Sequence, residues 1–535
     1  MSKQPVWWIA AASVLASVFA LAGLQESLWV DELHSMWVIC GPIEEIGSRA
    51  SAGNQSPLFY GMLWAGYWTL VFFGCSPEWS IRLPSVLLWL STISLTGWLC
   101  CRTVLKEEPD NPRGSSLDSL GWSFPVLMFS LLAITLDRIQ WFYASEARPY
   151  AAVQLVSFLG WWQLLRMWRR RTMPKRDIVG WTLVVGLMLQ LHLLSVVAVL
   201  WQWIVLFALA LRRSLSDVKH CFLAGVVCAL FFALALVWTP ELWLRRRQWE
   251  SFAGDSTWQH AVGLFPIVAI LCPIAVCLAV DSLLASRKQH QPVQQREGRN
   301  WPEIFFWCVA TLGPWLTAWL ITAAGIAPVM HRRYVIVSAI PLVCFSASLL
   351  RACNRSRICS CAWLLSLASL LVTQQTLEVW RAGDVVGWQR VEGWRQAAEF
   401  VQQNWQQGDQ LWCASELIEG NRQELPLDDS TNRYLSYPLR GAYRVIERNG
   451  TGATSVSANA LVNDQALWAK QLVDRRLLGH RQWIVMRSTA EKLQAHLARV
   501  QSDMSNAGFR MSLRQSPVPF GRVSVACLEY SLVDQ

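Results

Sequence analysis

The stretch Leu28-Trp29-Val30-Asp31-Glu32-Leu33-His34-Ser35-Met36-Trp37 follows directly on the first long apolar run of the chain, residues 6–24. It places two adjacent carboxylates, Asp31 and Glu32, where a membrane-spanning helix is expected to end. A carboxylate at that depth is costly unless it faces a cavity or a partner group. A polar flank that marks the water boundary is the simpler interpretation. The arginines of later loops favour a functional interpretation of the two carboxylates.

The composition is that of a membrane protein. Of the 535 residues, 53% are hydrophobic and only 16% are charged, whereas a soluble protein carries about a quarter charged residues. Long apolar stretches recur up to residue 377 and then stop. The 33 tryptophans suit the membrane–water interface, which the indole ring prefers. The net charge of +10 comes from basic residues in short loops between the apolar stretches, so we expect no nucleic-acid partner.

Apolar stretches of about 20 residues predict about eleven transmembrane helices. The segments are 6–24, 81–101, 121–136, 150–167, 178–191, 193–211, 221–239, 261–285, 304–326, 335–350 and 362–376. The apolar run 180–211 is too long for a single crossing, and we expect it to break at His192. The segment 25–80 is a long first outer loop. Its piece 57–74 has a helical apolar pattern, which predicts a helix on the outer membrane surface, with a further span as the alternative.

Lysine and arginine are concentrated in alternate loops, which predicts a cytoplasmic N-terminus and an extracytoplasmic tail. The expected location is the bacterial inner or plasma membrane, crossed many times. Several arginines lie on the predicted outer side, against this rule, and therefore need another explanation. They are Arg49, Arg82, Arg138, Arg148, Arg245, Arg246, Arg247, Arg332 and Arg333.

The fold class that follows is an α-helical polytopic membrane protein with a small C-terminal α/β domain. We assign residues 1–379, including the outer loop 25–80, to the multi-span domain and residues 380–535 to the extracytoplasmic domain. In this domain the patterns predict helices at 393–405, 466–477 and 489–504, and strands at 410–414, 443–446 and 482–486. It contains no Gly-rich phosphate loop, and we assign it no chemistry.

A second informative stretch, Trp141-Phe142-Tyr143-Ala144-Ser145-Glu146-Ala147-Arg148-Pro149-Tyr150, joins the third and fourth predicted spans on the outer side. Glu146 and Arg148 stand close together in it, and Pro149 suits the first turn of the next helix. A local interfacial ion pair is the simplest explanation of the two charges. The functional alternative is a carboxylate and a guanidinium fixed at the lip of an outward cavity.

Four stretches, in chain order, resemble bacterial membrane glycosyltransferases of the C-type fold. This superfamily includes the dolichyl-phosphate-mannose–protein mannosyltransferases and aminoarabinose transferase. WVDELHSMW (29–37) resembles the family's Asp-Glu pair, and YASEARPYAA (143–152) its Ser-Gln-Glu-Ala-Arg-Pro-Tyr signature. QSPLFY (55–60) with IRLP (81–84) resembles the His-Pro-Pro-Leu-Tyr-Tyr helix and the Arg-Leu-Pro after it, and HRRYVIVSAIPL (331–342) the late Arg-Tyr loop. Gln55 replaces the family's histidine, so a role for an imidazole there does not carry over.

The resemblance implies transfer of a sugar from a polyprenyl-phosphate donor in the bilayer to a protein, lipid or glycan acceptor on the outer face. Inverting transfer needs a carboxylate that deprotonates the acceptor hydroxyl. Asp31 is the first candidate and Glu32 the second, while Glu146 would position the acceptor or hold Arg148. Guanidinium groups suit the leaving phosphate. The candidates are Arg82, Arg148, Arg332 and Arg333. We predict no cofactor and no metal ligands, although a divalent metal stays open.

Two other functions compete with this one. A transporter or flippase of a lipid-linked substrate would also bind a lipid phosphate, but transporters tend to show internal repeats and mid-membrane charges. This sequence shows no such repeat, and its charges gather at one predicted face. A membrane anchor for the tail domain would leave the acid and arginine loops unexplained. Sugar transfer by the purified protein would distinguish the first function from both others.

Overall fold

The computed structural model describes residues 4–105, 116–170, 173–245, 257–286, 301–353, 355–381, 391–417, 425–449, 452–473 and 478–532. The chain forms two compact units, which are described separately. The membrane unit comprises Met1–Leu24, Ala50–Phe73 and Arg82–Gly387. The tail unit comprises Gln25–Arg49, Gly74–Ile81 and Trp388–Gln535. Parts of the first outer loop, residues 25–80, therefore belong to the same compact unit as the C-terminal residues.

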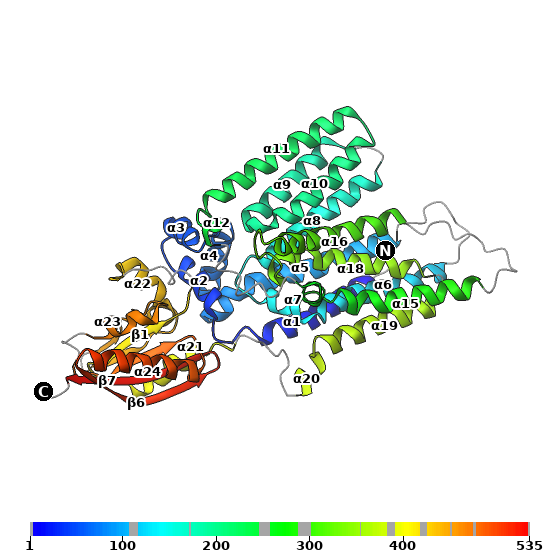
Figure 1. The fold of residues 1–535 in the computed structure, drawn as a ribbon. Coiled ribbons are helices and arrows are strands. Elements are labelled where there is room, and N and C mark those ends of the chain that lie inside the picture. Colours follow the sequence, from blue (N-terminus) through cyan, green and yellow to red (C-terminus); the bar gives the residue numbers. More distant parts are fainter. Residues whose placement is uncertain are drawn as a thin grey trace. The chain divides into compact units, whose positions relative to one another are not determined.

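The membrane unit is built from helices packed on helices (Figure 1). Neighbouring pairs include α8 with α9, α9 with α11, α16 with α18, and α15 with α19. The helices are α1 (Gln4–Ala22), α4 (Pro57–Phe72), α5 (Pro77–Leu105, whose first turns belong to the tail unit), α6 (Ser116–Thr135), α7 (Arg138–Ala144), α8 (Tyr150–Arg169), α9 (Lys175–Leu191), η2 (Leu193–Ser195), α10 (Val196–Leu211), α11 (Leu215–Val237), α12 (Leu242–Arg245), α14 (Trp258–Gly263), α15 (Ile267–Ser286), α16 (Trp301–Ala323), α17 (Arg332–Val335), η4 (Ile336–Ser338), α18 (Ala339–Arg351), α19 (Ser356–Thr373) and α20 (Thr376–Arg381).

The helices agree with the predicted spans, because each predicted segment falls on one to three of them. Within the described residues, six helices are long and apolar enough to cross a membrane, or seven if the bent pair Pro125–Thr135 and Arg138–Ala144 is one span. The prediction of about eleven spans is larger than this number. Part of the difference comes from short helices: Trp7–Ala22 and Arg357–Thr373 are apolar, and α9 has 17 residues. The multi-span helical fold itself is confirmed.

The predicted break at His192 is confirmed. Helix α9 ends at Leu191, and His192 has an extended backbone with φ −158° and ψ 114°. The single 3-10 turn η2 follows and leads into α10. One extended residue thus divides the long apolar run into two helices and places an imidazole between them. The segment 57–74 is also helical, as α4, although its position on a membrane surface stays a prediction.

The tail unit combines helices with a mostly C-terminal β-sheet. Its five-stranded sheet has the order β4-β1-β5-β7-β6, and β2 and β3 form a separate antiparallel pair. Strand β1 is parallel to β4 and β5, whereas β7 is antiparallel to β5 and β6. The elements are α2 (Val30–Ile39), η1 (Ile43–Glu45), α3 (Ile46–Ala52), α21 (Trp394–Asn404), β1 (Gln410–Ala414), α22 (Asp429–Leu435), η6 (Pro438–Ala442), β2 (Ile446–Asn449), β3 (Gly452–Ser455), β4 (Asn459–Ala460), η7 (Gln465–Leu467), α23 (Trp468–Leu472), β5 (Gln482–Met486), α24 (Ala490–Asn506), β6 (Phe509–Phe520) and β7 (Val523–Leu532).

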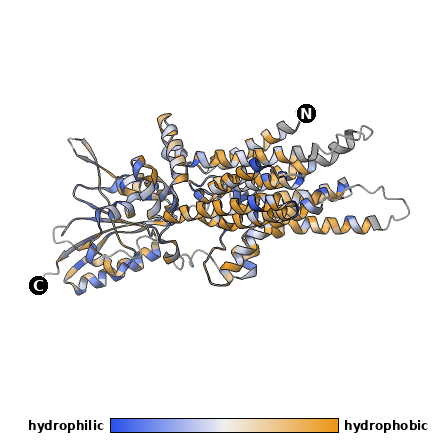
Figure 2. Cartoon of the chain, turned by 90° about the horizontal axis from the view of Figure 1, so that it is seen from above, coloured by the Kyte–Doolittle hydropathy of each residue, from blue (hydrophilic) through white to orange (hydrophobic). Residues whose placement is uncertain are grey.

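The core of the tail unit lies between the sheet and α24. Leu493, Leu497, Val500 and Met504 recur at helical spacing on α24 and are all buried. They pack in one cluster with residues of β5 and β7, including Ile484. Figure 2 shows that hydrophobic residues dominate the helices of the membrane unit, whereas the tail unit mixes hydrophobic and hydrophilic ones. This difference is the expected one for a bundle in lipid and a domain in water.

Several tail predictions are confirmed. The strands at 410–414 and 482–486 are β1 and β5, and the helices at 393–405 and 489–504 correspond to α21 and α24. The strand predicted at 443–446 is misplaced, since β2 begins at Ile446. The helix predicted at 466–477 is the 3-10 turn η7 followed by α23, which ends at Leu472, and its positions 474–477 lie outside the described residues.

Candidate active site

The turn between α7 and α8 carries the first two candidates of the membrane unit. Glu146 is 1% exposed and Arg148 is 7% exposed. The Arg148 N–H donates to the Glu146 carbonyl at 2.8 Å, which closes the turn, and Pro149 immediately precedes α8. Buried ionisable residues are rare in membrane proteins and mark functional positions. The prediction that these two charges belong to a site is therefore consistent with their burial.

Tyr60 on α4 is the direct partner of Arg148. The Arg148 Nη1 donates to the Tyr60 hydroxyl at 3.0 Å, and that hydroxyl donates to the Gln55 Oε1. Tyr60 is 1% exposed, and it lies in the first turn of α4, which begins at Pro57. Gln55 thus serves as a hydrogen-bond acceptor at the position where the resembling family has histidine. Tyr60 is not recognisable as a candidate from the sequence, because a tyrosine in an apolar helix gives no charge signal.

The segment from His331 to Tyr334 brings a second arginine. The His331 Nδ1 accepts from the Arg333 N–H at 3.3 Å and so caps α17. The Arg333 guanidinium lies over the Tyr334 ring, 4.9 Å from its centroid. Arg333 is half-buried, whereas Arg332 is exposed. The two adjacent arginines therefore differ in environment, which their sequence alone does not show.

His192 connects the two arginine segments. Its ring is 5.7 Å from the ring of Tyr150 and 5.7 Å from that of Tyr334, between centroids. Burial, followed by the positive charges of Arg333 and Arg148, lowers the pKa of His192 to about 3. The imidazole is therefore neutral at physiological pH, and both guanidinium groups act on the same ring. In the sequence, His192 is recognisable only as the break in an apolar run, because a lone histidine between apolar helices carries no ligand spacing.

These contacts define a polar cluster inside the membrane unit. Tyr150 lies within electrostatic reach of Arg333, Arg148 and Glu146, and its ring is 5.2 Å from that of Tyr143. The cluster joins segments that are far apart in the sequence, with two guanidinium groups among aromatic rings. Such a site suits a phosphate, which accepts several charge-assisted hydrogen bonds at once. Its members are Gln55, Tyr60, Glu146, Arg148, Tyr150, His192, Arg333 and Tyr334.

Arg82 on α5 has a different set of contacts. It is fully buried, and its Nη1 donates to the carbonyl oxygens of Gly23 at 3.2 Å and Leu24 at 3.1 Å. Both carbonyls follow the end of α1, where a cation compensates the helix dipole. Arg82 therefore fixes the residues that follow α1 in the chain and precede Asp31. Its proposed contact with a donor phosphate stays a prediction.

Asp31 and Glu32 lie in the first turn of α2, in the tail unit. Glu32 is fully buried, and its carboxylate accepts the backbone N–H of Trp29 at 3.5 Å, as a helix-capping acid does. Asp31 is only half-buried. The two carboxylates are thus unequal: Glu32 faces back onto its own helix start, whereas Asp31 is the more accessible. Accessibility is what a general base requires.

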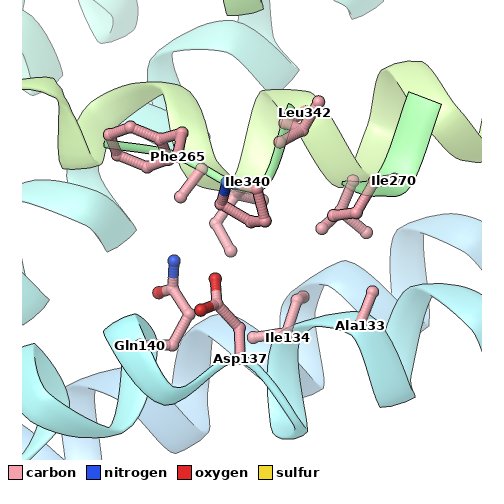
Figure 3. Close-up of a pocket in the computed structure, with 11 residues that line it drawn as sticks. Ala133, Ile134, Asp137, Gln140, Phe265, Ile270, Ile340 and Leu342 are labelled. Atoms are coloured by element: carbon pink, nitrogen blue, oxygen red, sulfur yellow. The ribbon is translucent and has the colours of Figure 1, made fainter. Parts of the chain in front are cut away.

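Asp137 was not among the predicted candidates, although it is 5% exposed. It lies at the break between α6 and α7 and lines a pocket with Gln140, Phe265 and Ile340 (Figure 3). Its Oδ1 accepts from the Ile139 N–H at 2.9 Å and from the Gln374 Nε2 at 2.6 Å. These bonds cap α7 and tie it to the end of α19, so the contacts favour a structural role. Asp137 could have been recognised in the sequence from the Asp137-Arg138 pair, which directly follows the predicted span 121–136.

The described residues contain no group of three or more His, Cys, Asp or Glu side chains that could hold a metal ion.

Comparisons with known proteins add one match. No protein-family model and no curated protein matches the sequence. Among solved structures, the chain is similar to the crystal structure of ArnT from Cupriavidus metallidurans in the apo state. The similarity covers 98% of this chain and 97% of that one, with 14% sequence identity and a TM-score of 0.45.

Proposed function

We propose that this protein is a membrane glycosyltransferase that takes a sugar from a polyprenyl-phosphate donor and passes it to an acceptor on the outer face of the membrane. The observation that carries the proposal is the polar cluster, in which the charges of Arg148 and Arg333 act on the same half-buried histidine and each arginine contacts a tyrosine. Two guanidinium groups in an aromatic setting fit a lipid phosphate at head-group depth. The resemblance in the sequence supplies the reaction.

In the proposed reaction, Asp31 acts on the acceptor, and Arg148 and Arg333 act on the leaving phosphate. The acceptor hydroxyl attacks the anomeric carbon, its proton goes to the Asp31 carboxylate, and the bond between the anomeric carbon and the phosphate oxygen breaks. The electron pair leaves with the phosphate, whose growing negative charge Arg148 and Arg333 stabilise. Phosphate is already a good leaving group, so a strong general acid is not required. Glu146, beside Arg148 in the same turn, holds that guanidinium in place or positions the acceptor.

The direct test uses full-length protein in nanodiscs and the lipid-linked sugar fraction extracted from cells that lack the protein. Release of free polyprenyl phosphate, followed by mass spectrometry, supports the transfer. Movement of intact lipid-linked sugar between the two leaflets, without release of the phosphate, supports the flippase instead. Comparing the surface glycans and glycolipids of cells with and without the protein then identifies the acceptor class.

A first prediction concerns orientation. The concentration of lysine and arginine in alternate loops predicts that the tail, from Trp380 onward, lies outside the cytoplasm. Protease added to intact spheroplasts should therefore remove it, while a cytoplasmic marker protein stays whole. A tail that is cut only after the membrane has been broken would place Asp31 and its unit on the cytoplasmic side and contradict the proposed direction.

A further inference from the structure

The start of α2 is held by one buried carboxylate of the tail unit. The Val30 N–H, directly before Asp31 in the chain, donates to the Glu392 Oε2 at 2.9 Å. The same oxygen accepts from the Trp394 indole N–H at 3.0 Å, and the Arg487 Nε donates to the other oxygen, Oε1, at 2.7 Å. Glu392 is 3% exposed. A buried carboxylate with both oxygens bonded has a fixed position and transmits it to the amide it binds.

This carboxylate sits at the carboxyl edge of the parallel part of the sheet. Strands β1 and β5 are parallel neighbours and end at Ala414 and Met486. The Arg487 N–H, one residue after β5, donates to the Ala414 carbonyl at 3.0 Å. In open α/β sheets, ligands and functional groups gather beyond the carboxyl ends of parallel strands. In this unit the group found at that edge is the first turn of α2.

The charges at this edge couple Arg487 to Asp31. Burial lowers the pKa of the Arg487 guanidinium, but the carboxylates of Glu392, Asp31 and Glu416 outweigh it and leave the pKa above its usual value. The positive charge of Arg487 and the negative charge of Asp31 therefore attract each other. Among the described residues, the ionisable groups of the tail unit around the start of α2 include Arg487, Glu392, Glu416, Glu32, His34, Tyr434, Tyr443, Arg395 and its ion-pair partner Glu78.

We propose that the carboxyl edge of the tail sheet positions the catalytic base: Glu392 fixes the helix turn that carries Asp31, and Arg487 anchors Glu392 and supplies a positive charge at the same edge. Both are positioning residues, because they act through Asp31. The inference rests on the proposed function, in which Asp31 is the base. It also assigns a role to the C-terminal domain, whose sequence contains no Gly-rich phosphate loop.

The same sheet contains a matched control pair at its opposite edge. Arg481 and Asp409 directly precede β5 and β1, and the Arg481 Nε and Nη2 donate to the two Asp409 oxygens at 3.0 and 2.6 Å. The side chains of this pair are 22% and 4% exposed, against 19% and 3% for Arg487 and Glu392. Breaking either pair should therefore disturb the fold to a similar degree, while only one pair touches α2.

The experiment measures the acid limb of the pH–rate profile for release of polyprenyl phosphate from the extracted donor fraction. Arg487→Gln removes the cation and should move the acid limb to higher pH by about one unit. Glu392→Gln leaves Arg487 without its carboxylate and should move the limb to lower pH. Arg481→Gln should leave it in place. A purely structural role would shift the first two variants in the same direction, or not at all, and either result overturns the proposal.

Two further measurements keep the outcome decisive. If Arg487→Gln does not fold, Glu392→Gln decides alone, and an unchanged or raised acid limb contradicts the inference. Amide hydrogen exchange should be faster in residues 30–36 of Glu392→Gln and unchanged there in Arg481→Gln. Asp31→Asn distinguishes a failure of the positioning inference from a failure of the proposed function. If Asp31→Asn is inactive while Arg487→Gln and Glu392→Gln keep the wild-type pH–rate profile, the positioning inference fails and the proposed function stands. If Asp31→Asn is fully active, the assignment of the base itself fails.

Discussion

Asp31→Asn is expected to lower the rate of donor consumption about a hundredfold to ten-thousandfold, the usual contribution of a general base. The change keeps the size of the side chain and removes the carboxylate that takes the proton of the acceptor. Asp31 is half-buried in the first turn of α2, where it is not the residue that caps the helix. The full-length protein should therefore stay folded, which thermal unfolding in detergent can verify.

Glu32→Gln is the matched control for this prediction. Glu32 is adjacent and fully buried, and glutamine can replace glutamate in its capping bond to the Trp29 N–H. We expect this variant to retain most of its activity. If Glu32→Gln is inactive and Asp31→Asn is active, the general base is Glu32 and not Asp31. If both variants are active, the acid pair only marks the membrane boundary and the mechanism is wrong.

Arg333→Ala is expected to weaken use of the donor about tenfold to a hundredfold, because a hydrogen bond to a charged group contributes about 1.5–3 kcal/mol. Arg333 is half-buried in the polar cluster, where its charge acts on His192 and Tyr150. Arg333→Lys should lose less, since it keeps the charge but not the planar fork that bonds two phosphate oxygens. Binding of undecaprenyl phosphate, as the product lipid, should fall in parallel with activity.

Arg332→Ala serves as the matched control for Arg333. Arg332 is adjacent, carries the same charge and is exposed, so its loss should change donor use by less than about twofold, as for most exposed charges. The two arginines were equivalent candidates in the sequence, and the structure favours Arg333. A double change to alanine that leaves both binding and transfer intact would mean that both side chains only extend to the interface.

Local patterns were sufficient for the helices and for part of the tail. Each apolar segment is helical because a chain in lipid must satisfy its backbone hydrogen bonds within the segment. Strands β1 and β5 were recognisable because they are short and buried on both faces. Strands β6 and β7 were not predicted: β6 is largely half-exposed with polar residues, and its pairing with β7 depends on contacts across a turn.

The sequence by itself determined which charges could matter, because Asp31, Glu146, Arg148 and Arg333 are ionisable residues beside apolar helices, where each is costly. Only the tertiary structure decided which neutral residues accompany them. Tyr60 and His192 carry no charge signal, and they join the polar cluster through contacts between segments distant in the sequence. The same holds for Glu392, whose bond to Val30 links positions 362 residues apart. Such pairings depend on side chains that meet only when the helices and the sheet have packed, and no local pattern encodes them.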